Sequence, residues 1–308
     1  MLHRVVPDTC NSLLNPLCRN LSIAVSLQSL ERVIRFFLSR EYDFISLNQV
    51  EERLNTPAKK KFIAFTFDDG YLDNFLYAYP LLHKYKIPFA IYLTTGLPDY
   101  TQSLWWFYLE DWIEAGKPIN FEFVGQRFAF SCEKDDDKRN AINSLGLFLE
   151  TSSPEVLDRF LREILEPRFG DPFTKTRIFS LNWPQIRLLS QDPLVTIASH
   201  GTFHNNLTCL THTQLEDNLS RAKTRIEDEI GRSVEHFAYP FGHVGSFNED
   251  VVQVLTKVGY RTATTTLHGT LNRKHCKYIL YLPRISLNCK SEPWLELLCC
   301  GLPRRLYI

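Results

Sequence analysis

Nearly continuous apolar runs alternate along this chain with segments whose apolar residues recur at helical spacing. The run 62–67 is apolar at almost every position, and a strand that is apolar on both faces is typical of a parallel sheet covered by helices. Two more strands are expected at 88–93 and 194–198, and helices at 73–85, 213–230 and 248–258. Repeated βα units of this length predict an α/β fold, either a barrel or a doubly wound sheet.

Residues from about 97 to 180 interrupt this alternation. The segment holds an aromatic cluster near Trp105, a charged stretch at 133–139 that is typical of a loop, and a helix start at Ser153. Its apolar content is too thin for a separate core. We therefore expect a helical insertion within a single domain that spans 1–308.

Composition narrows the function classes. Lys plus Arg and Asp plus Glu number 35 each, so charge gives no reason to expect nucleic acid as a partner. No apolar run approaches the roughly 18 residues that a membrane helix needs, and no secretory signal is apparent. The eight cysteines form no C-x-x-C pair, which is typical of thiols in a reducing compartment. These features favour a cytoplasmic location, unless upstream residues are missing.

Two polar fragments follow buried strands and carry the candidate chemistry. Asp68 and Asp69 come after the first strand, and His200 and His204 come after the strand 194–198. Catalytic groups gather at the carboxyl ends of strands in α/β folds. An i, i+4 histidine pair on a helical turn and one carboxylate suit a divalent metal, and the second carboxylate is then free to act as a base. The alternatives are a helix N-terminus capped by the aspartates and two incidental histidines.

Four ordered segments resemble the NodB-homology polysaccharide deacetylases, carbohydrate esterase family 4. They are residues 65–71 (Phe-Thr-Phe-Asp-Asp-Gly-Tyr), 199–204 (Ser-His-x-x-x-His), 237–242 (Phe-Ala-Tyr-Pro-Phe-Gly) and 282–285 (Leu-Pro-Arg-Ile). The resemblance implies that the fold is a distorted (β/α)7 barrel. It also implies that the protein removes an N-acetyl group from a sugar.

The same resemblance implies a role for each matched residue. Asp69, His200 and His204 would hold the metal, usually zinc and sometimes cobalt or manganese. Asp68 would be the general base that takes a proton from the attacking water. The backbone N–H of Phe241 would stabilise the oxyanion.

The sequence departs from the family pattern at two places. Ala238 stands where an arginine usually orients the base, and Arg284 is the candidate substitute, unless it forms only an ordinary salt bridge. The usual C-terminal Leu-x-His acid motif is also missing. A related branch has a Tyr-His-x-Val segment near the N-terminus, which Leu-His-Arg-Val at 2–5 resembles, so His3 is the candidate acid. The alternative is that a histidine so close to the terminus is frayed and idle.

Aromatic residues could supply a sugar-binding platform. Trp105, Trp106 and Tyr71 are the candidates, and the alternative is that they pack the insertion against the barrel.

Three function hypotheses remain at this point. The first is a metal-dependent hydrolase that removes an N-acyl group from an amino sugar in a polysaccharide or glycan precursor. The second is a catalytically silent carbohydrate-binding protein that kept the barrel. The third, a metallophosphatase or nuclease, is disfavoured by the neutral charge balance.

Overall fold

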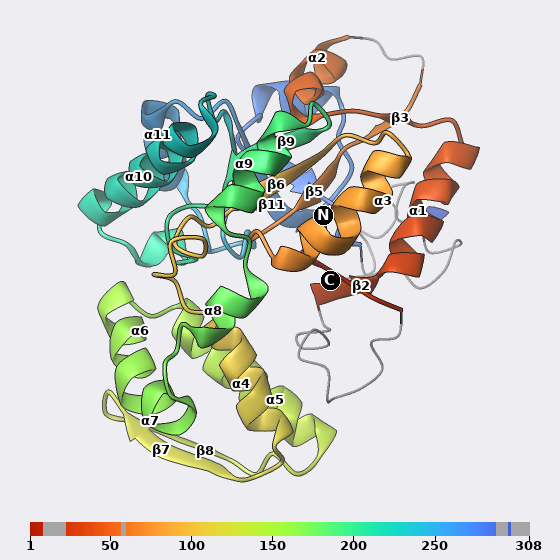
Figure 1. Cartoon of the computed structure of the whole chain (residues 1–308). Helices are drawn as coiled ribbons and strands as arrows, with labels where there is room; N and C mark the ends of the chain where they lie inside the picture. Colours follow the sequence, from red (N-terminus) through yellow and green to blue (C-terminus); the bar gives the residue numbers. More distant parts are fainter. Residues whose placement is uncertain (9–22, 57–59, 288–294, 297–308) are drawn as a thin grey trace.

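The computed structural model describes residues 1–8, 23–56, 60–287 and 295–296. At its centre lies a six-stranded parallel sheet with the strand order β12-β11-β10-β9-β6-β5 (Figure 1). Every residue of β6 is buried, as expected for a strand covered on both faces of a parallel sheet. The strands are β5 (Phe65–Phe67), β6 (Phe89–Leu93), β9 (Val195–Ser199), β10 (His236–Ala238), β11 (Thr262–His268) and β12 (Leu282–Arg284).

The N-terminal residues connect the two edges of this sheet. Leu2 forms a parallel bridge with Phe67, the last residue of β5. The backbone of Met1 donates to Ile285 and accepts from Leu287, both of which follow β12. The sheet is therefore curled, and residues 1–2 take the seventh position of the expected distorted (β/α)7 barrel, between β5 and the chain after β12.

Amphipathic helices cover the sheet, with α10 and α11 on one side and α1 and α3 on the other (Figure 1). Helix α10 begins one residue earlier than expected, and its capping box is formed by Thr211 and Gln214. It ends at Ile230, as predicted, and is followed by Gly231 in a left-handed conformation. The covering helices are α1 (Leu27–Ser39), α3 (Tyr79–Lys84), α9 (Trp183–Gln191), α10 (His212–Ile230) and α11 (Glu249–Val258).

Short elements at the sheet margins differ from the sequence expectations. The predicted strand at 62–67 is divided, because β4 (Phe62–Ile63) pairs with β3 (Asp43–Phe44) and only β5 joins the central sheet. The predicted helix at 73–85 starts with the π turn η4 (Asn74–Ala78) and continues as α3. The remaining short elements are β1 (Arg4–Val6), β2 (Ala24–Ser26), η3 (Leu47–Gln49), α2 (Val50–Asn55), η6 (Leu207–Cys209) and η7 (Arg273–Lys277).

The insertion lies below the sheet in Figure 1, in yellow and green. The expectation that it lacks a core is wrong, because its own buried side chains, such as Trp112, Phe160 and Leu165, form a separate hydrophobic cluster. It also contains an antiparallel β-hairpin. Its elements are α4 (Trp105–Glu114), β7 (Ile119–Phe123), β8 (Gln126–Phe130), α5 (Asp135–Glu150), α6 (Pro154–Phe160), η5 (Leu161–Leu165), α7 (Glu166–Phe169) and α8 (Thr174–Phe179).

The charged stretch at 133–139 is the start of α5 rather than a loop. Three aspartates, Asp135 to Asp137, occupy the first turn of this helix. Carboxylates there are stabilised by the partial positive charge of a helix N-terminus. The charged residues at this point therefore stabilise the start of a helix, where we had expected a loop.

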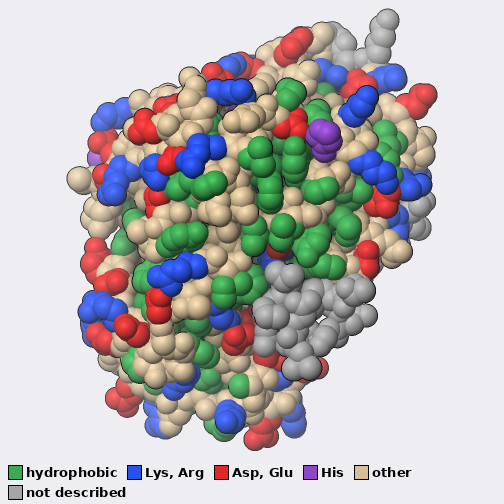
Figure 2. Space-filling view, in the orientation of Figure 1, with side chains coloured by type: hydrophobic (Ala, Val, Ile, Leu, Met, Phe, Trp, Pro, Cys, Tyr) green, Lys and Arg blue, Asp and Glu red, His purple; other side chains and the backbone are tan. Residues whose placement is uncertain are grey.

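The surface is mixed in charge, with acidic and basic side chains interspersed over the face in Figure 2. Within the described residues, no helix is both long and apolar enough to cross a membrane. Cys132, Cys209 and Cys276 lie in the described part of the chain, and none of the three forms a disulfide.

Candidate active site

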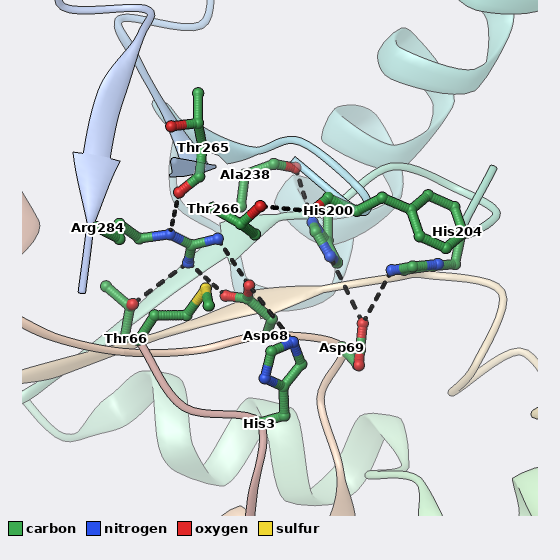
Figure 3. A network of polar contacts seen from close by, with 12 residues as sticks. His3, Thr66, Asp68, Asp69, His200, His204, Ala238, Thr265, Thr266 and Arg284 are labelled. Atoms are coloured by element: carbon green, nitrogen blue, oxygen red, sulfur yellow. Dashed lines mark hydrogen bonds and ion pairs between the residues drawn. The ribbon is translucent and has the colours of Figure 1, made fainter. Parts of the chain in front are cut away.

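Residues of the four motifs meet at the carboxyl ends of strands β5, β9, β10 and β12 of the curled central sheet (Figure 3). Asp68 and Asp69 follow β5, and the histidine motif follows β9. Asp69 has a φ of 72° and Gly70 a φ of 91°, so the chain turns sharply at this point. The φ of Gly70 would strain any residue with a side chain, so the turn favours glycine there.

The two histidines come from a loop, so the expected helical turn is wrong. Asn218 of α10 fixes this loop, because it accepts a hydrogen bond from the Thr202 backbone at 3.0 Å and another from the Thr202 hydroxyl at 2.7 Å. His200 and His204 still converge, and each Nε2 lies 3.5 Å from Asp69 Oδ1. The convergence that we predicted therefore depends on tertiary contacts rather than on helical spacing.

Asp69, His200 and His204 form a candidate metal centre, with ligand atoms all within 4.8 Å of one another. Asp69 Oδ1 is buried and has no hydrogen-bond donor among the described residues. A cation would satisfy such an orphaned carboxylate oxygen. Burial raises the pKa of Asp69, and that effect too is one a bound cation would oppose.

The two imidazoles are suited to metal binding. Burial lowers the pKa of His200 and of His204 to about 4, so both rings are neutral near pH 7. His200 Nδ1 lies 2.7 Å from the Ala238 carbonyl oxygen, which is an acceptor only. Nδ1 therefore carries the proton, and the lone pair of Nε2 points toward Asp69.

Asp68 is paired with Arg284, the residue nominated in place of the missing motif arginine. Arg284 Nη1 donates to Asp68 Oδ1 at 2.6 Å and Nη2 donates to Oδ2 at 2.7 Å. Arg284 Nε donates to the Thr265 carbonyl at 2.9 Å, which fixes the plane of the guanidinium. Burial is the largest single effect and opposes ionisation, but the favourable interactions together outweigh it, those with Arg284 foremost, and hold the pKa of Asp68 well below its usual range.

His3 lies in the site beside Asp68. Its Nε2 lies 3.9 Å from Asp68 Oδ2. Asn74 Nδ2 donates to the His3 carbonyl at 2.8 Å, and Asp73 accepts from the Val5 N–H at 3.0 Å and from Arg4 Nε at 2.7 Å. Sequence reasoning missed Asp73 and Asn74 because both residues fitted the start of a helix. The available signal was that a carboxylate and an amide follow the Asp-Asp-Gly turn closely in sequence.

The third motif lies beside the same site through Phe241. Phe241 has a φ of 61°, and its N–H has no acceptor among the described residues. The Phe241 ring packs against His204 with centroids 4.6 Å apart. Thr266 holds the loop, since its hydroxyl donates to the Phe241 carbonyl at 2.8 Å and its N–H to the Gly242 carbonyl at 2.9 Å.

The proposed aromatic platform is mostly wrong. Tyr71 is fully buried and Trp105 is 5% exposed, so neither can stack on a sugar ring. Trp105 packs within the hydrophobic cluster of the insertion itself rather than against the barrel. Trp106 alone is partly exposed.

Comparison with known proteins agrees with this geometry. The polysaccharide deacetylase family model matches residues 55–120 and 164–263. YxkH of Bacillus subtilis (strain 168), whose name assigns it to the polysaccharide deacetylases, is 20% identical over 267 residues, covering 86% of this chain and 67% of that protein.

Solved structures share the fold. The Streptococcus pyogenes deacetylase PplD, in complex with acetate, has a TM-score of 0.60 at 17% identity, covering 97% of this chain and 96% of that one. A de-N-acetylase from Aggregatibacter actinomycetemcomitans has a TM-score of 0.57 at 16% identity, with 96% and 97% coverage. IcaB from Ammonifex degensii has a TM-score of 0.57 at 15% identity, with 96% and 93% coverage. The chain thus belongs to the polysaccharide deacetylase family, hydrolases that act on carbon–nitrogen bonds.

Proposed function

We propose that this protein is a metal-dependent deacetylase that removes an N-acyl group, in the simplest case N-acetyl, from an amino sugar of a polysaccharide or glycan precursor. One observation carries the proposal. The Asp68 carboxylate, ionised and oriented by Arg284, is adjacent in sequence to Asp69, which lies between two neutral imidazoles. A base beside an open metal centre is the arrangement that amide hydrolysis requires.

Asp69, His200 and His204 would hold the metal. Two nitrogen donors and one carboxylate suit zinc with positions left open, and cobalt or manganese would also fit this set. Such a cation, when bound, supplies Lewis-acid activation of water and of the amide carbonyl.

The chain's own residues would then divide the proton transfers. Asp68 accepts a proton from the attacking water, and Arg284 keeps both of its oxygens in place. The Phe241 N–H, which has no acceptor among the described residues, donates to the oxyanion that develops at the carbonyl oxygen as water adds to the carbonyl carbon. His3 donates a proton to the departing amine, and the products are acetate and the free amino sugar.

The alternative is a silent carbohydrate-binding protein. Two departures from the family pattern favour this alternative, the missing motif arginine and the missing acid motif. The first is a weaker argument now, because Arg284 of β12 pairs with Asp68. The second is weakened by the 3.9 Å separation of His3 and Asp68. The cytoplasmic location stays a prediction.

Acetate release separates the two functions. The purified protein would be incubated with a panel of N-acetylglucosamine oligosaccharides, with zinc and with excess chelator. We expect acetate and free amine in the zinc arm, and none after chelation. Binding of an oligosaccharide without acetate release in any metal arm would support the silent binding protein instead.

A further inference from the structure

The proposed acid and the proposed base are fixed to one another through the backbone. The Asp68 N–H donates to the Leu2 carbonyl at 3.0 Å, and the Leu2 N–H donates to the Thr66 carbonyl at 2.8 Å. His3 follows directly, and its Nε2 lies 3.9 Å from Asp68 Oδ2 (Figure 3). The position of the His3 imidazole therefore also depends on how β1, the strand that begins at the next residue, is held.

Arg4, the first residue of β1, is fully buried, although arginine is rarely buried unless it is paired. We propose that Arg4 is a positioning residue for His3. It ties the backbone beside the acid to the start of η4 on one side and to the insertion on the other. This inference rests on the proposed role of His3, and it gives the insertion a task in protonation of the departing amine.

The side chain of Asp73 holds Arg4 and the backbone of β1 together. Arg4 Nε donates to Asp73 Oδ2 at 2.7 Å, and the Val5 N–H donates to Asp73 Oδ1 at 3.0 Å. Asn74 Nδ2 donates to the same Oδ1 at 3.1 Å and to the His3 carbonyl at 2.8 Å. The backbone on both sides of Arg4 is thus bound to two consecutive side chains that closely follow the Asp-Asp-Gly turn.

The guanidinium of Arg4 also lies against aromatic rings of the insertion. Its Cζ is 5.2 Å from the ring centroid of Phe107 in α4 and 5.6 Å from that of Phe179 in α8. The two phenylalanine rings stack with centroids 5.0 Å apart, where α4 and α8 lie next to the barrel (Figure 1). A cation at this range is attracted to the face of an aromatic ring. Arg4 therefore contacts the barrel and both ends of the insertion at once.

An apolar side chain would fill the same space without the cost of removing a cation from water. Replacement of a buried ion pair by well-packed apolar residues is often neutral or even stabilising. Arginine differs from such a residue because its planar group donates in a fixed direction. The hydrogen bond to Asp73 therefore sets the position of β1, and with it the backbone that carries His3.

This arrangement predicts an effect on one step of the reaction. Protonation of the amine needs His3 within hydrogen-bond reach of the nitrogen, and a misplacement of about 1 Å can cost about 100-fold in rate. Attack of water depends instead on the metal and on Asp68, which Arg284 orients. Loss of Arg4 should therefore slow a reaction that needs the acid and spare one that does not.

Two substrates separate these reactions. An N-acetylglucosamine oligosaccharide releases an amine that must be protonated, whereas p-nitrophenyl acetate releases a phenolate that needs no proton. Arg4→Met keeps a long side chain but removes the charge and the donors, and Phe107→Leu removes one ring beside the guanidinium. Phe160→Leu is the control, because Phe160 is as deeply buried as Phe107 but belongs to the insertion's own cluster. Zinc affinity and thermal unfolding would be measured for each variant.

We expect Arg4→Met to lower kcat on the oligosaccharide about tenfold or more and Phe107→Leu several-fold, with p-nitrophenyl acetate turnover and zinc affinity within about twofold of wild type. Phe160→Leu should behave as wild type on both substrates. If Arg4→Met does not fold, Arg4→Lys takes its place, since lysine keeps the charge but not the planar donor.

His3→Gln, measured on the same two substrates, separates failure of the inference from failure of the proposed acid. If His3→Gln loses only oligosaccharide turnover while Arg4→Met loses neither activity, or loses both equally, the inference alone is overturned. If His3→Gln keeps full oligosaccharide turnover, the proposed role of His3 fails and this inference fails with it.

Discussion

Arg284 donates two parallel hydrogen bonds to Asp68, at 2.6 and 2.7 Å, from a strand 216 residues further along the chain. Such a bidentate pair fixes both the charge and the orientation of the carboxylate. The pair is the contact that we expected of Arg284, since this chain has Ala238 at the third-motif position where an arginine was expected.

Replacing Arg284 with lysine should lower kcat about 100-fold while metal content stays at the wild-type level. Lysine keeps the positive charge but cannot donate in a planar fork, so Asp68 would be misplaced. Steady-state kinetics and metal analysis on the same preparation would check this. Arg261→Lys is the control, because Arg261 forms exposed ion pairs with Glu51 and Glu235. An unchanged kcat in Arg284→Lys would exclude the orienting role.

Replacing His3 with glutamine should lower kcat about 10²- to 10⁴-fold, the usual contribution of a general acid, and leave zinc affinity unchanged. Asn74→Ala should lower kcat less, since it removes the 2.8 Å hydrogen bond to the His3 carbonyl and the 3.1 Å hydrogen bond to Asp73 Oδ1 but leaves the imidazole in place. Kinetics and zinc titration of both variants provide the measurement. If His3→Gln turns over at the wild-type rate, another group protonates the amine.

Gly242 and Gly245 offer a matched pair in the third-motif loop. Both have positive φ, 66° and 99°, so alanine strains the backbone at either position. Only at Gly242 would a Cβ meet other atoms, with Thr266 N at 2.7 Å. Gly242→Ala should therefore displace the Phe241 N–H and lower kcat at least tenfold, whereas Gly245→Ala should cost stability alone. Similar kcat values in the two variants would argue against Phe241 as the oxyanion donor.

His236 should make the fold sensitive to acid. Burial lowers the pKa of His236 to about 4, and its ring nitrogens lie 2.8 Å from Thr262 Oγ1 and 2.7 Å from Asn48 Oδ1. The unfolded chain protonates near the ordinary value of 6.5, so this contribution to stability is present above 6.5 and is lost as the pH falls toward 4. Between pH 7 and pH 5 it amounts to about 2 kcal/mol.

Urea unfolding in excess chelator would measure that loss without a contribution from metal release. The unfolding free energy of wild type should fall by about 2 kcal/mol more between pH 7 and pH 5 than that of His236→Gln. His200 and His204 titrate in both proteins, so the difference isolates His236. Parallel pH profiles for the two proteins would show that His236 does not carry the acid sensitivity.

The sequence predicted the parts of this molecule that depend on local pattern. Buried strands such as β6 were recognisable from their apolar runs, and their carboxyl ends placed the motif residues at a common edge. The position of Arg284 beside Asp68 followed from the resemblance and not from periodicity. A contact across 216 residues leaves no local trace in the sequence.

The misses share a physical cause. The division of 62–67 into β4 and β5, the loop that carries His200 and the core of the insertion all depend on partners distant in sequence. Trp106 was one aromatic residue among several, and nothing local distinguished it from Trp105. Only the tertiary structure shows that the Trp106 indole N–H donates to Tyr71, whereas Trp105 lies in the core of the insertion.

The central claim is that Asp68 is the base and Asp69 a ligand of the same metal. Asp68→Asn tests it most directly, with acetate release and zinc content measured on one preparation. The account predicts about one zinc per chain, as in wild type, and a loss of turnover of at least 10²- to 10⁴-fold. Turnover at the wild-type rate in Asp68→Asn, or loss of the zinc with the carboxylate, would contradict it.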